Sequence, residues 1–428
     1  MNVIEEHESE VRSYCRSWPT VFDRAVGSVM WNTDGERYID FFSGAGALNY
    51  GHNDPDLKAA LVDYLAGDGV VHSLDMFTKA KSDFLQTFDE VVLAPRGLDY
   101  KVQFPGPTGT NAVEAALKLA RKVKGREQIV SFTNAFHGMT LGSLAVTGNS
   151  MKRGGAGIPL AHSTPMPFCN YLDEGSGLSY FESLLADSGS GLDLPAAVIV
   201  ETVQGEGGIN VASFPWLRRL AELCQDNDIL LIIDDIQMGC GRTGPFFSFE
   251  PAGITPDIVT LSKSISGYGF PMALTLLRPE LDVWEPGEHN GTFRGHNPAF
   301  VTGSAALRKF WSDDALTNEV EAKAKLIEGA MLSIVSTTPG TDTRGRGFAQ
   351  GLVFEDPAMA SAVVKACFQR HLLLETSGPE GEVVKAMPAL TISENELNEG
   401  LDILAAAVAE VMGASTETGA PADEAVSS

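Results

Sequence analysis

The sequence predicts an α/β fold in which a mostly parallel sheet is flanked by helices and joined to a smaller α+β domain. Short runs of Val, Ile and Leu without polar alternation indicate strands that are buried on both faces, at Ile129–Phe132, Ala196–Glu201, Ile229–Asp234, Ile258–Leu261 and Ala273–Leu277. Helical patterns between these runs supply the crossovers that parallel strands need. At 428 residues, the chain exceeds the usual size of one hydrophobic core, which predicts two domains.

The other expected elements follow in chain order. Near the N-terminus we predict two strands separated by a Gly-containing turn, at Ser28–Trp31 and Tyr38–Phe42. Amphipathic patterns predict helices at Ala112–Lys124 and Phe214–Asp226. Beyond Trp311 the pattern predicts a charged helix, a strand and another helix, at Asn318–Val335, Arg346–Phe354 and Pro357–Arg370.

These elements predict four segments. Residues 1–55 form an N-terminal arm that joins the small domain, and residues 56–310 form the large domain. Residues 311–412 form the C-terminal α+β domain. Residues 413–428 contain no large apolar side chain apart from one valine, so we expect a disordered tail there.

Composition narrows the class of protein. Lys and Arg number 31 against 56 Asp and Glu, which gives a net charge of −25 and opposes binding to nucleic acid or to an anionic membrane. The acidic N-terminus lacks the apolar core of a secretory signal, and no apolar stretch is long enough to span a bilayer. The five cysteines are scattered, as is typical of reduced thiols. We therefore expect a cytoplasmic protein with no metal site.

A lysine and an acid occupy positions that suit one cofactor. Asp234 ends the apolar run Ile229–Asp234, and Lys263 follows the run Ile258–Leu261 in a loop rich in Ser and Gly. An amine and a buried carboxylate are what an enzyme needs to hold pyridoxal 5′-phosphate, because the amine forms a Schiff base and the carboxylate keeps the ring nitrogen protonated. Taken alone, such a lysine is more often solvated and such an acid is commonly a helix cap.

Three further groups fit the same cofactor. Gly109 and Thr110 precede the helix Ala112–Lys124, where free N–H groups and the helix dipole favour a phosphate. The ring of Phe136 could stack on a flat heterocycle or pack in the core. Glu206 lies in a glycine-rich loop after the run Ala196–Glu201, near a strand end where parallel sheets bind ligands.

Taken in order, these motifs resemble the class III aminotransferases, which are fold type I pyridoxal-phosphate enzymes. The resemblance covers roughly residues 20–400 and rests on segments at Thr108–Arg121, Phe136–Gly138, Val203–Gly208, Asp234–Gln237, Gly241–Gly244, Ser262–Lys263 and Gly291–Phe293. It implies that Lys263 forms the Schiff base and Asp234 binds the ring nitrogen. It also implies a set of cofactor contacts, with Gln237 near the ring hydroxyl, Phe136 on the ring face, Gly109 and Thr110 at the phosphate, and Thr292 at the neighbouring subunit's phosphate. At least a homodimer is therefore expected.

Other segments resemble the branch of this family that makes L-2,4-diaminobutyrate for ectoine biosynthesis, at Phe41–His52, Ala135–Gly142, Thr147–Arg153 and Glu288–Gly295. The expected reaction moves the amino group of L-glutamate to L-aspartate 4-semialdehyde, and an acidic chain fits a role in osmoadaptation. The alternatives are another class III enzyme acting on ornithine, N-acetylornithine, 4-aminobutyrate or taurine, a pyridoxal-phosphate mutase or racemase, or a non-catalytic pyridoxal-phosphate-binding regulator.

The expected enzyme must present different ends of its two substrates to the cofactor. Many relatives use a glutamate that pairs with an arginine of the C-terminal domain and releases it for a carboxylate. Glu206 matches the glutamate, whereas Lys385 stands in place of the arginine. Lysine cannot make the bidentate fork to a carboxylate. Arg294 and the pair Lys152–Arg153 are alternative cations for the substrate.

Overall fold

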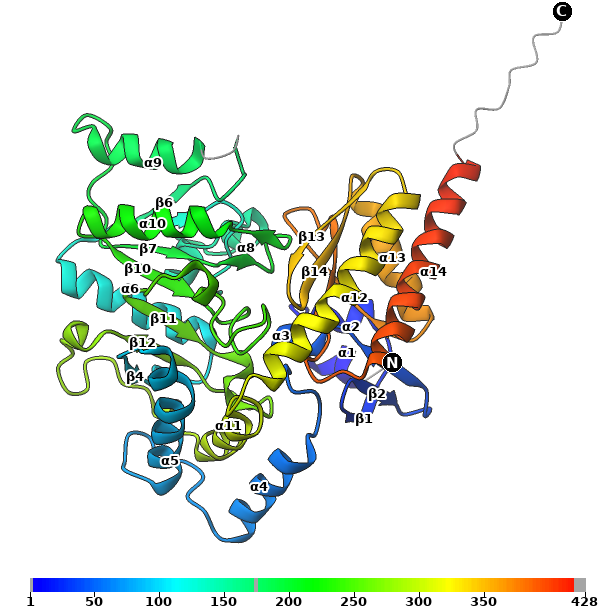
Figure 1. The fold of residues 1–428 in the computed structure, drawn as a ribbon, viewed down its shortest axis with the longest axis horizontal. Coiled ribbons are helices and arrows are strands. Elements are labelled where there is room, and N and C mark those ends of the chain that lie inside the picture. Colours follow the sequence, from blue (N-terminus) through cyan, green and yellow to red (C-terminus); the bar gives the residue numbers. More distant parts are fainter. Residues whose placement is uncertain (1–2, 173–175, 419–428) are drawn as a thin grey trace, which may run out of the picture.

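The computed structural model describes residues 3–172 and 176–418, and its largest element is a sheet of seven strands (Figure 1). In spatial order these are β4 (Lys101–Gln103), β12 (Leu274–Leu277), β11 (Ile258–Leu261), β10 (Leu230–Asp234), β7 (Ala197–Val200), β5 (Ile129–Phe132) and β6 (Ser163–Met166). The strands from β11 to β6 run parallel, and β12 and β4 add an antiparallel edge. The predicted α/β fold with a mostly parallel sheet is confirmed.

Both faces of this sheet are buried, which explains the unbroken apolar runs. Leu230 and Ile232 pack in one core with α6 (Gly109–Lys124). Leu231 and Ile233 pack in the opposite core with α10 (Phe214–Asp226). Because successive strand residues point to opposite faces, helices on both sides require apolar side chains at every position.

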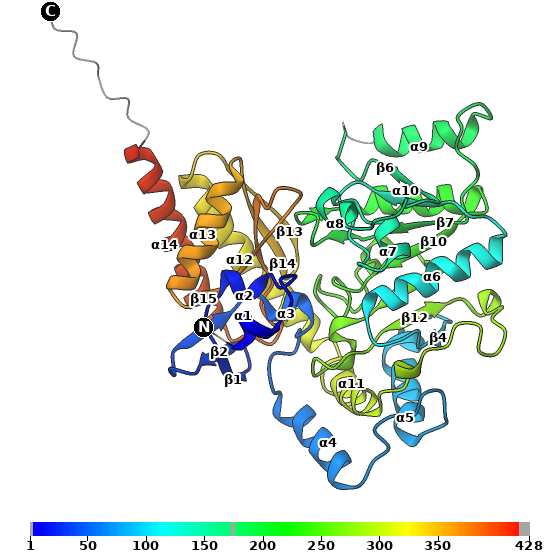
Figure 2. The same cartoon turned by 180° about the vertical axis from the view of Figure 1, so that it is seen from behind.

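A second part of the molecule combines the two ends of the described chain, as Figure 2 shows from behind. One sheet joins β1 (Phe22–Val26), β2 (Val29–Asn32), β3 (Arg37–Asp40) and β15 (Leu372–Leu373). The other joins β13 (Thr341–Arg346), β14 (Ala349–Phe354), β17 (Val383–Ala386) and β16 (Glu375–Ser377). The flanking helices are α12 (Ala315–Thr337), α13 (Pro357–Gln369) and α14 (Glu394–Thr418). Pairing of β3 with β15 anchors the N-terminal segment to the C-terminal part.

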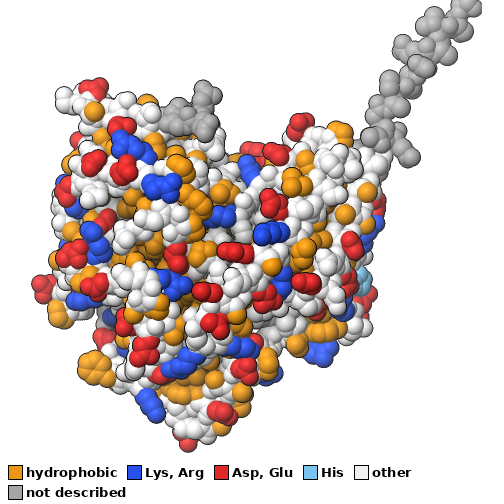
Figure 3. All heavy atoms as spheres, viewed as in Figure 1, with side chains coloured by type: hydrophobic (Ala, Val, Ile, Leu, Met, Phe, Trp, Pro, Cys, Tyr) orange, Lys and Arg blue, Asp and Glu red, His pale blue; other side chains and the backbone are white. Residues whose placement is uncertain are grey.

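The remaining helices and strands lie within these two parts or between them. They are α1 (Val3–His7), α2 (Tyr14–Ser17), α3 (Ser43–Gly46), α4 (Pro55–Ala66), α5 (Lys79–Phe88), α7 (Leu141–Ala145), α8 (Ser150–Gly154), α9 (Ser176–Ala186), α11 (Asn297–Phe310), β8 (Val203–Gln204) and β9 (Asn210–Val211). Among the described helices, none combines the length and apolarity that crossing a membrane would need. On the face drawn in Figure 3, acidic and basic side chains are interspersed rather than gathered by sign.

Three elements differ from the sequence prediction. Helix α6 begins at Gly109, so Gly109 and Thr110 lie in its first turn rather than before it. The strand expected near Arg346–Phe354 is β14, which begins just after the Gly347 turn, whereas its hairpin partner β13 was not predicted. Helix α14 continues to Thr418, into the segment where we expected disorder. The expected tail beyond Thr418 lies outside the described residues. The boundaries at residues 55, 310 and 412 stay a proposal.

Candidate active site

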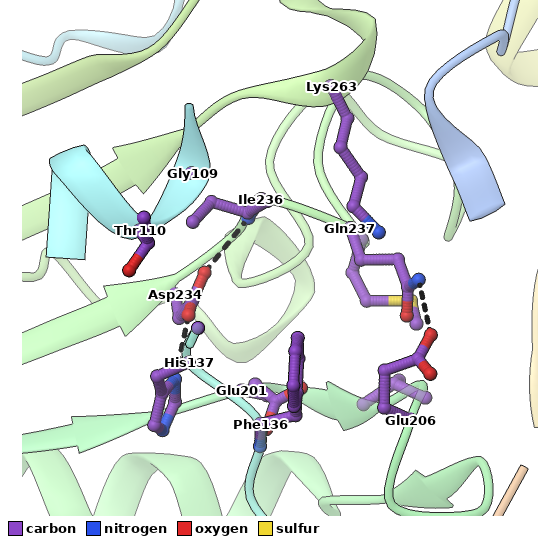
Figure 4. A pocket seen from close by; sticks show the side chains of 13 residues that line it. Gly109, Thr110, Phe136, His137, Glu201, Glu206, Asp234, Ile236, Gln237 and Lys263 are labelled. Atoms are coloured by element: carbon purple, nitrogen blue, oxygen red, sulfur yellow. Dashed lines mark hydrogen bonds and ion pairs between the residues drawn. The ribbon is translucent and has the colours of Figure 1, made fainter. Parts of the chain in front are cut away.

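A cavity of about 200 Å³ lies where the parallel strands end (Figure 4). Asp234 ends β10, Glu201 follows β7 directly, and Lys263 lies just after β11. Parallel strands place such residues at one edge of the sheet, where open α/β sheets bind ligands. The lining residues are Gly109, Thr110, Phe136, His137, Gly138, Glu201, Val203, Glu206, Asp234, Ile236, Gln237, Met238 and Lys263.

Lys263 reaches the cavity from a strained backbone position. Its φ of +52° is left-handed, which is uncommon outside glycine and is often retained at functional sites. Its Nζ donates a hydrogen bond to the Ala45 carbonyl at 2.7 Å. That carbonyl is presented by the turn Ser43–Gly46, in which all four residues have positive φ. Burial lowers the pKa of Lys263 to about 8, although Glu206 opposes this shift.

Asp234 is buried and held on three sides. Its Oδ2 lies 2.7 Å from Nδ1 of His137, whose side chain is fully buried. Its Oδ1 accepts hydrogen bonds from the Thr260 hydroxyl and the Ile236 N–H, each at 3.2 Å. Figure 4 shows Asp234 and His137 on one side of the cavity and Lys263 on the other. The sequence analysis placed Asp234 at a strand end but missed His137, because 97 positions separate the two residues.

The first turn of α6 forms another wall. The N–H groups of a first helical turn have no partner within the helix, and Gly109 and Thr110 both line the cavity. The Thr110 hydroxyl contacts the hydroxyls of Thr140 at 2.6 Å and Ser143 at 2.9 Å. A Cβ at Gly138, where φ is +130°, would approach Thr110 Oγ1 to 2.5 Å. Glycine at position 138 therefore keeps this wall open.

Phe136 and Glu201 meet beside the cavity. The Phe136 N–H donates to Glu201 Oε2 at 3.0 Å, which fixes the loop that carries the ring. Burial raises the pKa of Glu201 well above its usual range, and the nearby charge of Asp234 adds to the effect. The Lys152 ammonium lies 4.2 Å from the centroid of the Phe136 ring.

The two residues matched to the family's gate are in contact. Lys385 Nζ donates to Glu206 Oε1 at 2.7 Å, and Gln237 Nε2 donates to the same oxygen at 3.1 Å. Gln237 also donates to the Ala45 carbonyl at 3.0 Å, beside the bond from Lys263. The side chain of Lys385 is fully buried, whereas that of Glu206 is 20% exposed and faces the cavity.

The other two predicted positions lie outside this cavity. Thr292 is exposed in a loop near His72, which contacts its carbonyl at 2.7 Å. Arg294 donates to Asn290 Oδ1 at 2.9 Å in the same loop. The guanidinium of Arg153 donates hydrogen bonds to three backbone carbonyl oxygens between positions 144 and 147, so it is already engaged by the backbone. Among these candidate cations only Lys152 borders the site, because it contacts Phe136.

Comparison with known proteins shows to which family this chain belongs. The chain matches the family Aminotransferase class-III over residues 13–408. The protein belongs to the class III aminotransferases.

Individual relatives are similar over nearly the whole chain. A diaminobutyrate–2-oxoglutarate transaminase of Streptomyces coelicolor is 66% identical over 414 residues, 96% of this chain and 98% of that protein. The protein of the same name from Sporosarcina pasteurii is 58% identical over 416 residues, 96% of this chain and 97% of that protein. The ornithine aminotransferase of Toxoplasma gondii has a TM-score of 0.83 over 97% of this chain and 94% of its own. At 24% identity it shows the shared fold alone.

The pKa of Lys263 gives a testable titration. Below pH 8 its amine is mostly protonated and unreactive, and above pH 8 it is mostly neutral. Acetic anhydride labelling of the cofactor-free protein, mapped by mass spectrometry, should show half-maximal labelling of Lys263 near pH 8, about two units below an ordinary lysine. Because Glu206 raises this pKa, Glu206→Gln should move the midpoint to lower pH. A midpoint above pH 10 would contradict the assignment.

Proposed function

We propose that the protein is a diaminobutyrate–2-oxoglutarate transaminase. It moves the amino group of L-glutamate to L-aspartate 4-semialdehyde, giving L-2,4-diaminobutyrate and 2-oxoglutarate. The observation that carries the proposal is one cavity with Lys263 on one side and Asp234 on the other, in a chain 66% identical to a relative of this name. A cytoplasmic location and a role in ectoine biosynthesis are further parts of the proposal, and the five free cysteines support the location.

The cavity residues fit pyridoxal 5′-phosphate. Lys263 supplies the amine for its aldehyde, and Asp234 supplies the anion for its ring nitrogen. The first turn of α6, with Gly109 and Thr110, would hold the phosphate, while Phe136 and Gln237, which line the same cavity, would contact the ring. When bound, the cofactor draws electrons away from the substrate carbon that loses its proton.

The residues of the chain orient charges and move that proton. His137, Thr260 and the Ile236 N–H fix the Asp234 carboxylate, so its charge stays directed at one point of the cavity. The Lys263 amine, when not bonded to the cofactor, would take up and hold the proton that leaves the substrate carbon. A pKa of about 8 suits this task, because near neutral pH the amine is neutral part of the time and charged part of the time.

We also propose a homodimer in which Thr292 serves the neighbouring subunit. Thr292 lies on a surface with large exposed apolar side chains, where Phe77 is fully exposed and Phe293 is 63% exposed. The ring of Phe293 packs edge-on against His72, and a β-bridge from His72 to His296 joins the two loops. Large apolar side chains exposed on two joined loops are typical of an interface between proteins. A second copy seated there would bring Thr292 toward another cavity.

The covalent role of Lys263 has a direct test. Lys263→Ala should lose borohydride-dependent labelling by pyridoxal 5′-phosphate at this position, because none of the other described residues lining the cavity is a lysine. Turnover should fall by about 10²–10⁴-fold or more. Peptide mapping measures the label, and the exposed Lys365→Ala variant, on α13, should keep both label and turnover. Full activity of Lys263→Ala would refute the assignment.

A half-reaction screen tests the substrate assignment. The purified holoenzyme should lose its cofactor absorbance rapidly with L-glutamate and with L-2,4-diaminobutyrate. Ornithine, which is one methylene longer than diaminobutyrate, should react at about one tenth of the rate or less, because one methylene changes transition-state binding by about 1–3 kcal/mol. 4-Aminobutyrate lacks the α-ammonium group and N-acetylornithine carries it acetylated, so both should also react more slowly. Stopped-flow spectroscopy gives the rates. Fast bleaching by 4-aminobutyrate with little by diaminobutyrate would move the protein to another branch of the family.

The dimer has its own test. Phe77→Asp places a charge on the exposed apolar surface and should weaken self-association by at least about thirtyfold, the effect of losing a residue worth 2 kcal/mol at an interface. Sedimentation velocity measures the oligomer. The control Leu332→Asp changes a side chain that is 51% exposed on α12, and it should leave the oligomer intact. A wild-type protein that sediments as a monomer would refute the dimer.

A further inference from the structure

A second carboxylate holds the lysine that replaces the family's arginine. Glu375 in β16 lies directly opposite Lys385 in β17, as cross-strand partners of one antiparallel pair. Glu375 Oε1 lies 2.8 Å from Lys385 Nζ, and Glu206 Oε1 lies 2.7 Å from the same nitrogen. Both ion pairs are sheltered, since the Lys385 side chain is fully buried and that of Glu375 is only 9% exposed.

The two carboxylates differ in their freedom to move. Glu375 and Lys385 share a register, so their separation would require the sheet to rearrange. Glu206 lies in the loop after β8 and lines the described cavity, whereas Glu375 does not. If Glu206 turned away, Lys385 would still be paired with Glu375. A gate that frees a bare cation for a carboxylate is therefore absent from this arrangement.

The charges of the cluster are set by burial and by each other. Burial disfavours the ionised form of Glu206 most strongly, but the Lys385 and Lys263 ammonium groups outweigh it and hold the pKa of Glu206 well below its usual range. Burial likewise lowers the pKa of Lys385, yet the two carboxylates together raise it above its usual value. Burial raises the pKa of Glu375, with Lys385 opposing. The cluster thus joins two carboxyl groups to one ammonium.

The cavity-facing oxygen of this cluster is available to a ligand. Glu206 Oε1 accepts hydrogen bonds from Lys385 and from Gln237. Glu206 Oε2 accepts no hydrogen bond from the described residues. A fixed carboxylate oxygen in a sheltered cavity makes a strong, charge-assisted hydrogen bond with an ammonium group. It repels a carboxylate at the same place.

Building on the proposed function, we propose that Glu375 determines substrate specificity by keeping Lys385 neutralised, so that Glu206 receives the α-ammonium group of diaminobutyrate. Diaminobutyrate presents its γ-amine to Lys263, which leaves its α-ammonium group further along the cavity. Glutamate reacts through its α-amine, so the cluster offers it no matching partner. Glu375 acts through Lys385 and Glu206 and is a positioning residue.

The test compares both substrates in variants of position 375. Glu375→Gln removes one negative charge at constant shape and leaves Lys385 paired with Glu206. The KM for diaminobutyrate should rise about tenfold, the factor for one charge-assisted contact worth about 1.4 kcal/mol. The KM for glutamate should stay unchanged or fall, because Lys385 becomes a better partner for a carboxylate. Glu375→Asp keeps the charge and should restore part of the wild-type KM for diaminobutyrate.

Two controls separate this effect from general damage. Glu355→Gln removes an equal charge from an exposed position at the end of β14 and should change neither KM. The thermal unfolding midpoint reports any loss of packing in the variants. Equal changes in both KM values, or none, would overturn the role of Glu375. Failure of the wild-type holoenzyme to react with diaminobutyrate would instead overturn the proposed function and is seen before any variant is made.

Discussion

The burial of the Lys263 ammonium is the constraint on which the rest of the site depends. An amine enclosed in protein is costly to keep charged, and its pKa falls to about 8. The left-handed turn Ser43–Gly46 contributes to this enclosure, because its Ala45 carbonyl accepts a hydrogen bond from Lys263 Nζ at 2.7 Å. That turn belongs to the N-terminal segment, which pairs with the C-terminal part through β3 and β15. The reactive amine therefore exists in this form only when both parts of the molecule are assembled.

Much of the fold and the centre of the site could be predicted from the sequence. Apolar runs without alternation located the parallel strands, because such runs occur where helices cover both faces of a sheet. Asp234 and Lys263 could be found because each follows a buried run, and parallel strands end at one edge. Phe136, Gly109, Thr110, Gln237 and Glu206 line the same cavity as those two residues. Local sequence was enough to predict the place of a residue where that place depends only on the strand or helix that carries the residue.

The contacts that escaped prediction all depend on long-range backbone geometry. His137 contacts Asp234 across 97 positions, and the Ala45 carbonyl contacts Lys263 across 218. Backbone carbonyls carry no sequence signal, and the left-handed Ala45 does not resemble a typical turn residue. Glu375 and Lys385 are only ten positions apart, yet their pairing depends on the register of a hairpin whose turn the apolar pattern does not specify. Thr292 and Arg294 do not line the cavity of their own chain, so their expected roles stay predictions.

A lysine at position 385, where the family resemblance leads one to expect an arginine, suits the geometry around the second carboxylate. A guanidinium is a planar fork that matches one carboxylate through two parallel hydrogen bonds, whereas an ammonium is a compact charge with three donors. Lys385 uses that compactness to bridge Glu206 and Glu375, which approach from different elements at 2.7 and 2.8 Å. If a buried ammonium had only one carboxylate partner, movement of that carboxylate would leave the positive charge unpaired inside the protein. Such an unpaired buried charge destabilises the folded protein by several kcal/mol. Two partners remove that cost, and they also fix Glu206 as an anion facing the substrate.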